Sequence, residues 1–327
     1  MGPYRRGRMN ADDTHHAPNP PAWTRRGFIA TVLATGALAA CGGSDDASTS
    51  TPGSVGAAGT DAAQTDAAGT DAAGTSPEDG YTIVQRFPQA VQVPGELRLP
   101  VSLSDGEAAL LQDGPSTLGA QVFDEQGTAV GGRIEAARRD AVPGPYYDFR
   151  PTIETTGFYV LQVEGGTPEG ASFDVADPST VVVPIPGQPL PPLDTPTVTD
   201  GAGVDPICTR EPDACPFHDI TLTEALASGK QVAYYVGTPA FCSTGVCAPG
   251  LESLIEVQDA YADTHVFVHA EVYTDDTATT LTPAVEALNL FYEPVLFVTD
   301  TTGVILERLD AVWNTDELVE VLDRSRA

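Results

Sequence analysis

Basic residues are scarce in this chain of 327 residues, whose single lysine is Lys230. Lys and Arg together number 16 against 46 Asp and Glu, so the formal net charge is −30. Such a chain repels nucleic-acid phosphates and anionic lipid headgroups, which excludes nucleic-acid binding as a first interpretation. We interpret the acidity as favouring solvation and colloidal stability, and not as a cation site.

Methionine is also scarce, since Met1 and Met9 are the only two. A chain cleaved downstream of them has no thioether, a ligand that soft copper sites often use. The uncharged apolar run over 27–40 is too short for a stable membrane span. These shortages count against a copper protein and against a spanning helix in this region.

The first 40 residues are typical of a targeting segment. Arg25 and Arg26 precede the apolar run, and the stretch from Thr24 to Ile29 resembles the twin-arginine export signal, a receptor-read address. The stretch 38–40 followed by Cys41 resembles a bacterial lipobox, in which the cysteine is lipidated and becomes the N-terminus. The alternative is a signal peptide in which Cys41 is incidental. The polar residues that follow favour the lipoprotein, so we expect a lipid anchor on the extracytoplasmic face of the cell membrane.

Residues 41–79 consist mainly of Ala, Gly, Thr, Ser and Asp, with a short tandem repeat over 60–73. This composition buries too little apolar area to offset the entropy of ordering the chain. We predict a disordered tether that holds the folded domains away from the membrane.

Short alternating segments separated by Gly, Pro and Asp turns fill residues 80–177 and predict an all-β domain. The strand candidates are 96–104, 119–123, 158–163 and 171–175. The segment Gly157 to Val163 resembles the late strand of immunoglobulin-like sandwiches, where a tyrosine near the strand start, here Tyr159, binds the backbone of a corner. Because no cysteine falls in this domain, an antibody-type disulfide is excluded. The domain shows no cluster of catalytic residue types.

Six prolines between 184 and 196 mark residues 178–204 as a semi-rigid, extended linker. From 205 to 327 the pattern becomes mixed α/β, with helices interleaved between strands. The expected helices are 222–228, 246–261, 283–290 and 315–324, and the expected strands are 231–236, 265–273, 295–299 and 304–309. Thr221 and Glu224 have the spacing of a capping box, and Gly229 closes the first helix.

This order of elements resembles the thioredoxin fold, with Cys242 just before a helix and Pro294 just before a later strand. The matching stretches, Asp205 to Arg210, Cys215 to His218, Thr238 to Cys242 with Cys247, and His269 to Tyr273, are similar to exported thioredoxin-like domains of actinobacterial type. The resemblance implies a cis bond before Pro294, which then faces the cysteine pair and shapes the substrate groove. It also implies thiol–disulfide exchange by Cys242 and Cys247.

A sulfur in front of a helix feels unpaired N–H groups, which stabilise the thiolate. We therefore predict Cys242 as the attacking thiol and Cys247 as the resolving thiol, in a C-x4-C variant. Residues five apart on a continuous helix point about 140° away from each other, so 243–245 must be loop if the pair is to close. The acid that thioredoxins bury on the preceding strand is replaced here by Val236.

Two other polar residues are candidates for an auxiliary role. His269 and Glu271 share one side of the neighbouring strand, and we expect that either can reach toward the Cys242 and Cys247 pair. The alternative for His269 is a half-buried residue with satisfied hydrogen bonds.

Four cysteines remain after lipidation of Cys41, an even number that predicts two disulfides in an exported chain. Three pairings are possible, and sequence proximity favours Cys208 with Cys215 and Cys242 with Cys247. The first pair is expected to be a structural bridge that contributes about 2 kcal/mol. A zinc site made of Cys208, Cys215 and His218 lacks an obvious fourth ligand. We predict no metal and no cofactor.

Three functions are compatible with these residues. The first is a lipid-anchored thiol–disulfide oxidoreductase acting on thiols and disulfides of exported proteins, with an unidentified redox partner. The second is a non-catalytic binding or scaffold lipoprotein in which the pair is structural. The third is copper delivery of the Sco type, whose cysteine pair has three intervening residues instead of four and whose histidine lies later in the chain.

Overall fold

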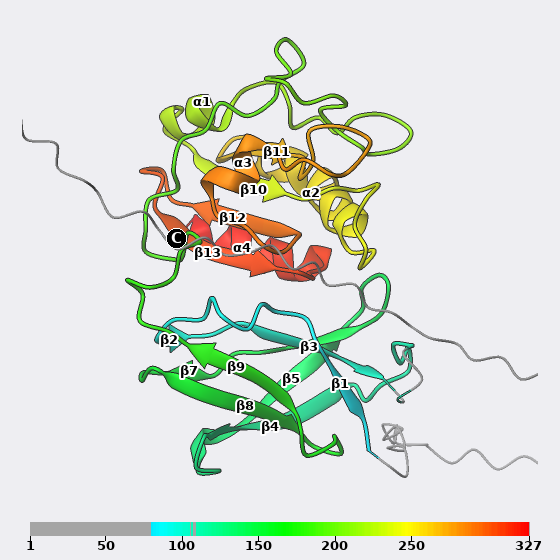
Figure 1. Ribbon diagram of the computed structural model, residues 1–327, viewed down its shortest axis with the longest axis vertical. Coiled ribbons are helices and arrows are strands. Elements are labelled where there is room, and N and C mark those ends of the chain that lie inside the picture. Colours follow the sequence, from blue (N-terminus) through cyan, green and yellow to red (C-terminus); the bar gives the residue numbers. More distant parts are fainter. Residues whose placement is uncertain (1–79, 105, 107–108, 327) are drawn as a thin grey trace, which may run out of the picture. The chain divides into compact units, whose positions relative to one another are not determined.

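The computed structural model describes residues 80–326 except 105, 107 and 108, and these belong to one compact unit. An all-β part, β1 to β9, is followed by a part that alternates helices and strands, α1 to α4 with β10 to β13 (Figure 1). In this described range no helix has both the length and the apolar character needed to cross a membrane. Arg25, Arg26, Cys41 and the expected tether lie outside the described residues.

The all-β part is built from seven strands in the order β1-β3-β6-β5-β4-β8-β9, with β2 and β7 paired separately. The strands are β1 Thr82–Gln85, β2 Gly95–Glu96, β3 Leu99–Ser104, β4 Thr117–Asp124, β5 Ala129–Arg139, β6 Tyr146–Phe149, β7 Thr152–Ile153, β8 Gly157–Val163 and β9 Ala171–Val175. The long strand β5 pairs with β4 along most of its length and with β6 at its end. One apolar core, including Leu99, Phe149 and Leu161, fills the interior.

The predicted strands of this part are confirmed to within a few residues, and Tyr159 has its expected contact. Its hydroxyl donates a hydrogen bond of 2.9 Å to the carbonyl of Thr155 at the start of β8. Strands β1, β5, β6 and β7 were not predicted. Strand β5 is mostly exposed and includes Gly131 and Gly132. Its polar sequence lacks the apolar alternation that identifies the other strands.

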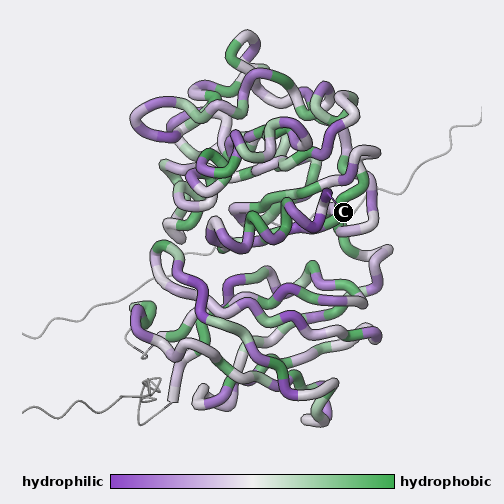
Figure 2. The backbone as a smooth tube through the Cα atoms, turned by 180° about the vertical axis from the view of Figure 1, so that it is seen from behind, coloured by the Kyte–Doolittle hydropathy of each residue, from purple (hydrophilic) through white to green (hydrophobic). Residues whose placement is uncertain are grey.

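The second part has a four-stranded sheet in the order β11-β10-β12-β13, in which only β10 and β11 are parallel. Its elements are α1 Leu222–Ala227, β10 Gln231–Val236, α2 Cys247–Tyr261, β11 His265–Ala270, α3 Pro283–Ala287, β12 Val295–Thr299, β13 Ile305–Asp310 and α4 Thr315–Ser325. The expected order is confirmed, although β11 ends three residues earlier than predicted. In the hydropathy colouring of Figure 2, hydrophobic stretches run through this part.

Alternation along β10 places helices on both faces of this sheet. Val232 and Tyr234 pack with α1 and α3, whereas Ala233 and Tyr235 pack with α2 and α4. The predicted capping box of α1 is present between Thr221 and Glu224. The parallel pairing of β10 with β11 places their carboxyl ends beside each other, and the loop with Cys242 follows the end of β10.

The Pro-rich segment 178–204 is irregular, as expected, but it is not a spacer between separate bodies. Its apolar residues Val183, Ile185 and Leu190 are at most 3% exposed. The backbone of Gly187 donates to Ile305 of β13, and Leu190 donates to Gly303. The segment packs on the α/β part because its alternate residues are apolar, a feature that its proline content conceals.

A buried ion cluster joins residues of the all-β part to helix α4. The Arg98 guanidinium contacts the Glu317 carboxylate at 2.7 Å, and Arg150 contacts the same carboxylate at 3.1 Å. Tyr146 also donates a hydrogen bond to Glu317, whose side chain is 1% exposed. Burial opposes the ionisation of Glu317, but the Arg98 charge outweighs it and lowers the pKa of this carboxyl to about 2.

We expect Glu317→Gln to lower the free energy of unfolding by about 3 kcal/mol at pH 7, because the buried Arg98 loses its carboxylate partner at 2.7 Å and keeps only Asp148, at 3.8 Å. A carboxyl with a lowered pKa in the folded state stabilises the protein above its unfolded pKa of about 4.3. The difference between the two proteins should therefore shrink as the pH falls toward 2. Glu320→Gln, which removes an exposed partner of Arg139, is the matched control and should cost less than about 1 kcal/mol. Denaturant titrations at several pH values measure both effects.

Candidate functional site

The first cysteine pair lies where the chain passes from β10 to α2. Strand β10 ends at Val236, and α2 begins at Cys247. The intervening residues form a loop in which Gly245 has a φ of 69°, so the expected interruption before the helix is confirmed. Cys247 is fully buried, whereas Cys242 is partly exposed. The two sulfurs and a carboxylate oxygen of Glu293 all lie within 4.8 Å of one another.

The surroundings of Cys242 favour its thiolate. The Cys247 thiol hydrogen-bonds to it, and despite partial burial the pKa of Cys242 falls to about 5, with help from Thr244 and the backbone N–H groups of Val246 and Cys247. The Thr244 hydroxyl is 3.3 Å from the Cys242 sulfur. Donation to Cys242, together with burial, raises the pKa of Cys247. The pair thus consists of an accessible thiolate and a buried thiol.

Glu293 is a site residue that the sequence analysis did not identify. It precedes Pro294, and the bond between them is cis, as the resemblance implied. Burial and the negative charge of Cys242 raise the pKa of Glu293 to about 7. A half-buried carboxyl thus lies beside the cysteine pair, although the strand position before it is occupied by Val236. The signal in the sequence was a lone acidic residue before the proline that was expected to face the cysteines.

A second cluster combines four buried side chains from two segments. Cys208 and Cys215 belong to the loop before α1, His218 follows them, and His269 lies on β11. The His269 Nδ1 atom is 3.7 Å from the Cys208 sulfur, 3.3 Å from the Cys215 sulfur and 3.1 Å from His218 Nε2. None of the four residues is more than 7% exposed.

The edge of the sheet positions this second cluster. Strand β11 is an edge strand, and its His269 N–H donates to the carbonyl of Phe217, which attaches the cysteine-containing loop to the sheet. The Glu271 carboxylate accepts hydrogen bonds from the backbone N–H of Thr209 at 2.6 Å and from its hydroxyl at 2.9 Å. The loop is therefore held on both sides of Cys215.

The predicted auxiliary residues have other roles than expected. His269 and Glu271 do point to one side of the sheet, but His269 contacts Cys208, Cys215 and His218, and Glu271 binds Thr209. Sequence reasoning placed both beside the Cys242 pair because it had no position for the loop 205–218. Thr209 of that loop contacts both Glu271 and Ala240, in the loop that carries Cys242.

Two residues connect the clusters. The hydroxyl of Thr209 accepts a hydrogen bond from the backbone N–H of Ala240, in the loop that carries Cys242. The Tyr235 ring lies 5.2 Å from the ring of His269, and its hydroxyl donates to the Cys247 carbonyl at 2.8 Å. The two clusters thus share supporting contacts through buried side chains.

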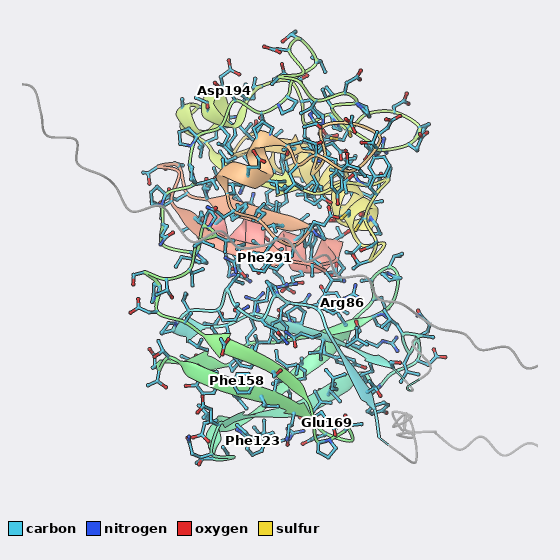
Figure 3. The ribbon with its side chains drawn as sticks, viewed as in Figure 1. Arg86, Phe123, Phe158, Glu169, Asp194 and Phe291 are labelled. Carbon is cyan, nitrogen blue, oxygen red and sulfur yellow. The ribbon has the colours of Figure 1, made fainter. Side chains whose placement is uncertain are left out.

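An apolar cleft of about 230 Å³ borders Glu293. Its walls include Tyr273, Leu281 and Phe291, and Phe291, labelled in Figure 3, is 62% exposed. The ring of Phe241, the residue before Cys242, packs edge-on against Tyr273. The cleft is therefore connected, through Tyr273, to the residue that precedes Cys242.

All four cysteines of the described residues are free thiols. Neither expected disulfide is formed in this structure, although each expected pair is brought together. The pairings Cys208 with Cys215 and Cys242 with Cys247 therefore remain predictions about the oxidised protein.

No protein-family model matches this chain, and no curated protein sequence matches it either.

Proposed function

We propose that the protein is an extracytoplasmic thiol–disulfide oxidoreductase whose α/β part is a thioredoxin-like domain. The observation that carries this proposal is the partly exposed Cys242, whose pKa of about 5 makes it a thiolate at neutral pH, beside the buried thiol of Cys247. The order of the helices and strands supports the assignment of the fold.

The chemistry needs two exchange steps. The Cys242 thiolate attacks one sulfur of a substrate disulfide, so that a Cys242–substrate bond forms and the other substrate sulfur leaves as a thiolate. Cys247 then loses its proton and attacks the Cys242 sulfur, which releases the second substrate thiolate. The substrate gains two electrons, and Cys242 and Cys247 become a disulfide. An external dithiol must reduce this pair again, and the reverse sequence oxidises a substrate.

Glu293 is suited to take the proton of Cys247. While Cys242 is a thiolate, its charge helps to keep Glu293 protonated, with a pKa of about 7. Formation of the mixed disulfide removes that charge, so the pKa of Glu293 falls and the carboxylate becomes available as a base. Glu293 therefore becomes a base at the step in which Cys247 must lose its proton.

The substrates that fit this site are exported proteins. The apolar cleft beside Glu293 offers a surface for an extended polypeptide segment near its disulfide, with Phe291 and Leu281 exposed at its rim. Pro294 adjoins the cleft and, in the proposed fold, shapes the substrate groove. The all-β part is proposed as an immunoglobulin-like domain, which the Tyr159 contact supports, and it serves as a spacer or binding module.

The proposed location is the extracytoplasmic face of the membrane, reached through the twin-arginine signal with Arg25 and Arg26. We expect the mature protein in the membrane fraction with lipid on Cys41. Cys41→Ala should abolish lipidation and either block processing or release the chain, while Ser44→Ala, a matched change just downstream, should do neither. Fractionation and mass spectrometry of the N-terminus measure this. A mature N-terminus well beyond Cys41 without lipid would contradict the anchor.

The alternative functions make different demands on the same residues. Copper delivery of the Sco type needs a histidine beside the Cys242 pair, whereas His269 contacts the other two cysteines. A scaffold needs no reactive thiol at all. Capture of substrates by Cys247 variants, described in the Discussion, is the experiment that separates an oxidoreductase from a scaffold.

A further inference from the structure

The second cysteine cluster has an arrangement of hydrogen bonds that a disulfide alone does not explain. His269 Nε2 lies 3.0 Å from the carbonyl oxygen of Gly237, and His218 Nδ1 lies 3.4 Å from that of Pro196. A carbonyl oxygen only accepts hydrogen bonds, so each of these ring nitrogens carries a proton. When both rings are neutral, the lone pairs are therefore on His218 Nε2 and His269 Nδ1.

Those two lone pairs face each other. His218 Nε2 and His269 Nδ1 are 3.1 Å apart, and the sulfurs of Cys208 and Cys215 complete a group whose four atoms lie within 4.8 Å of one another. Two neutral imidazoles in this orientation repel unless a cation lies between them. A histidine whose outer nitrogen donates to a carbonyl is also the usual arrangement of a metal ligand, since that bond fixes the tautomer and the ring.

We propose that Cys208, Cys215, His218 and His269 bind one zinc ion in a closed, structural site. His269 is the fourth ligand that the sequence analysis could not find, because it lies 51 residues after His218. The site is separate from the Cys242 pair and does not depend on the proposed oxidoreductase function.

The distances agree with tetrahedral zinc. Bonds of ~2.3 Å to sulfur and ~2.05 Å to nitrogen place tetrahedral ligands ~3.6 Å apart for sulfur and nitrogen and ~3.3 Å apart for two nitrogens. The sulfur–nitrogen distances to His269 are 3.7 and 3.3 Å, and the nitrogen–nitrogen distance is 3.1 Å. The three distances from His269 Nδ1 are therefore each within about 0.3 Å of the spacing that the ion requires, and the other ligand distances are within 4.8 Å.

The charges balance as well. Binding converts two thiols to thiolates and releases two protons, so the ion and its ligands are neutral together. A neutral group suits a place where all four ligands are buried. The Cys215 N–H, 3.3 Å from the Cys208 sulfur, donates a hydrogen bond that further supports a thiolate there. With four protein ligands the ion has no open position, so its role is to hold the loop 208–218 against β11.

Cys208 and Cys215 cannot bind zinc while they form a disulfide with each other. Substitution of a histidine distinguishes the two states, because only zinc binding needs the histidines. The experiment purifies the full chain under reducing conditions, removes metal with a chelator and titrates Zn²⁺ with a competing indicator, with Co²⁺ as a spectroscopic probe. We expect one zinc per chain and thiolate-to-cobalt charge-transfer absorption. His218→Gln, which leaves every cysteine in place, should weaken zinc binding by more than about 100-fold.

Two controls make the outcome specific. His265→Gln removes another buried histidine, outside the cluster, and should leave zinc binding unchanged. Cys242→Ser with Cys247→Ser should retain one zinc per chain. Zinc that is lost in this double variant but retained in His218→Gln would overturn the proposal. So would a reduced chain that takes up no zinc.

Discussion

Cys247→Ser is expected to convert the transient complex with substrate into a stable mixed disulfide through Cys242. The serine cannot attack the Cys242 sulfur, so the second exchange step stops and the first product accumulates. Cys242→Ser should form almost no such adducts, because Cys247 is fully buried and its pKa is raised. Turnover should fall by about 1,000-fold or more in either variant. Non-reducing gels and mass spectrometry of adducts from an extracytoplasmic extract measure the trapping.

The matched control for this experiment is Ser243→Ala, which changes an exposed residue of the same loop and should retain turnover without trapping. Selective alkylation supplies a second measure, since the reaction of Cys242 should rise with pH around a midpoint of about 5. If Cys242 has an ordinary thiol pKa of about 8.5 and Cys247→Ser forms no adducts, the oxidoreductase function is contradicted and the scaffold function is favoured.

Glu293→Gln is expected to slow the resolving step by about 100-fold to 10,000-fold, because the amide cannot take the Cys247 proton. The pH profile of the wild-type protein should contain an inflection near pH 7 that this variant lacks. The initial attack by Cys242 should be affected much less. Single-turnover kinetics with a disulfide peptide separate the two steps.

Glu293→Gln should raise the stability of the protein, although it lowers the rate of the resolving step. A carboxyl whose pKa is raised in the folded state is penalised when it ionises, so its stabilising proton is lost as the pH rises through about 7. Glu293→Gln should therefore unfold at a higher temperature than the wild-type protein at pH 8 and at nearly the same temperature below pH 4. Glu286→Gln, an exposed change on α3, is the control for both readouts. Equal resolving rates in Glu293→Gln and wild type would remove Glu293 from the mechanism.

Local patterns in the sequence were sufficient for most of the regular elements. The α/β order from α1 to α4 follows from apolar periodicity, and the capping box at Thr221 fixed one helix start. The same reasoning failed for β5, which is mostly exposed and carries little apolar signal. It also failed for 178–204, where proline content concealed alternate residues such as Val183 and Ile185 that pack into the α/β part.

The candidate site was harder to predict because its partners come from distant segments. Adjacent sequence and helix-start chemistry identified Cys242 and Cys247, which are five residues apart. Glu293 is brought to them by the antiparallel pairing of β12 with β10, a register that no local pattern contains. His269 was assigned to the wrong cysteine pair, because alternation along a strand shows which face of the sheet a side chain is on but not which residue it contacts. The backbone bond from His269 to Phe217 decides that partner.

Tyr235 and Thr209, which support both clusters, have a consequence for how such a chain can diverge. A descendant that lost Cys208 and Cys215 would leave empty space beside His269, against which the Tyr235 ring packs. The same tyrosine holds the Cys247 carbonyl, so the reactive pair would shift unless other residues refilled that space. The four cysteines are therefore expected to be inherited or lost together, as one unit of evolutionary change.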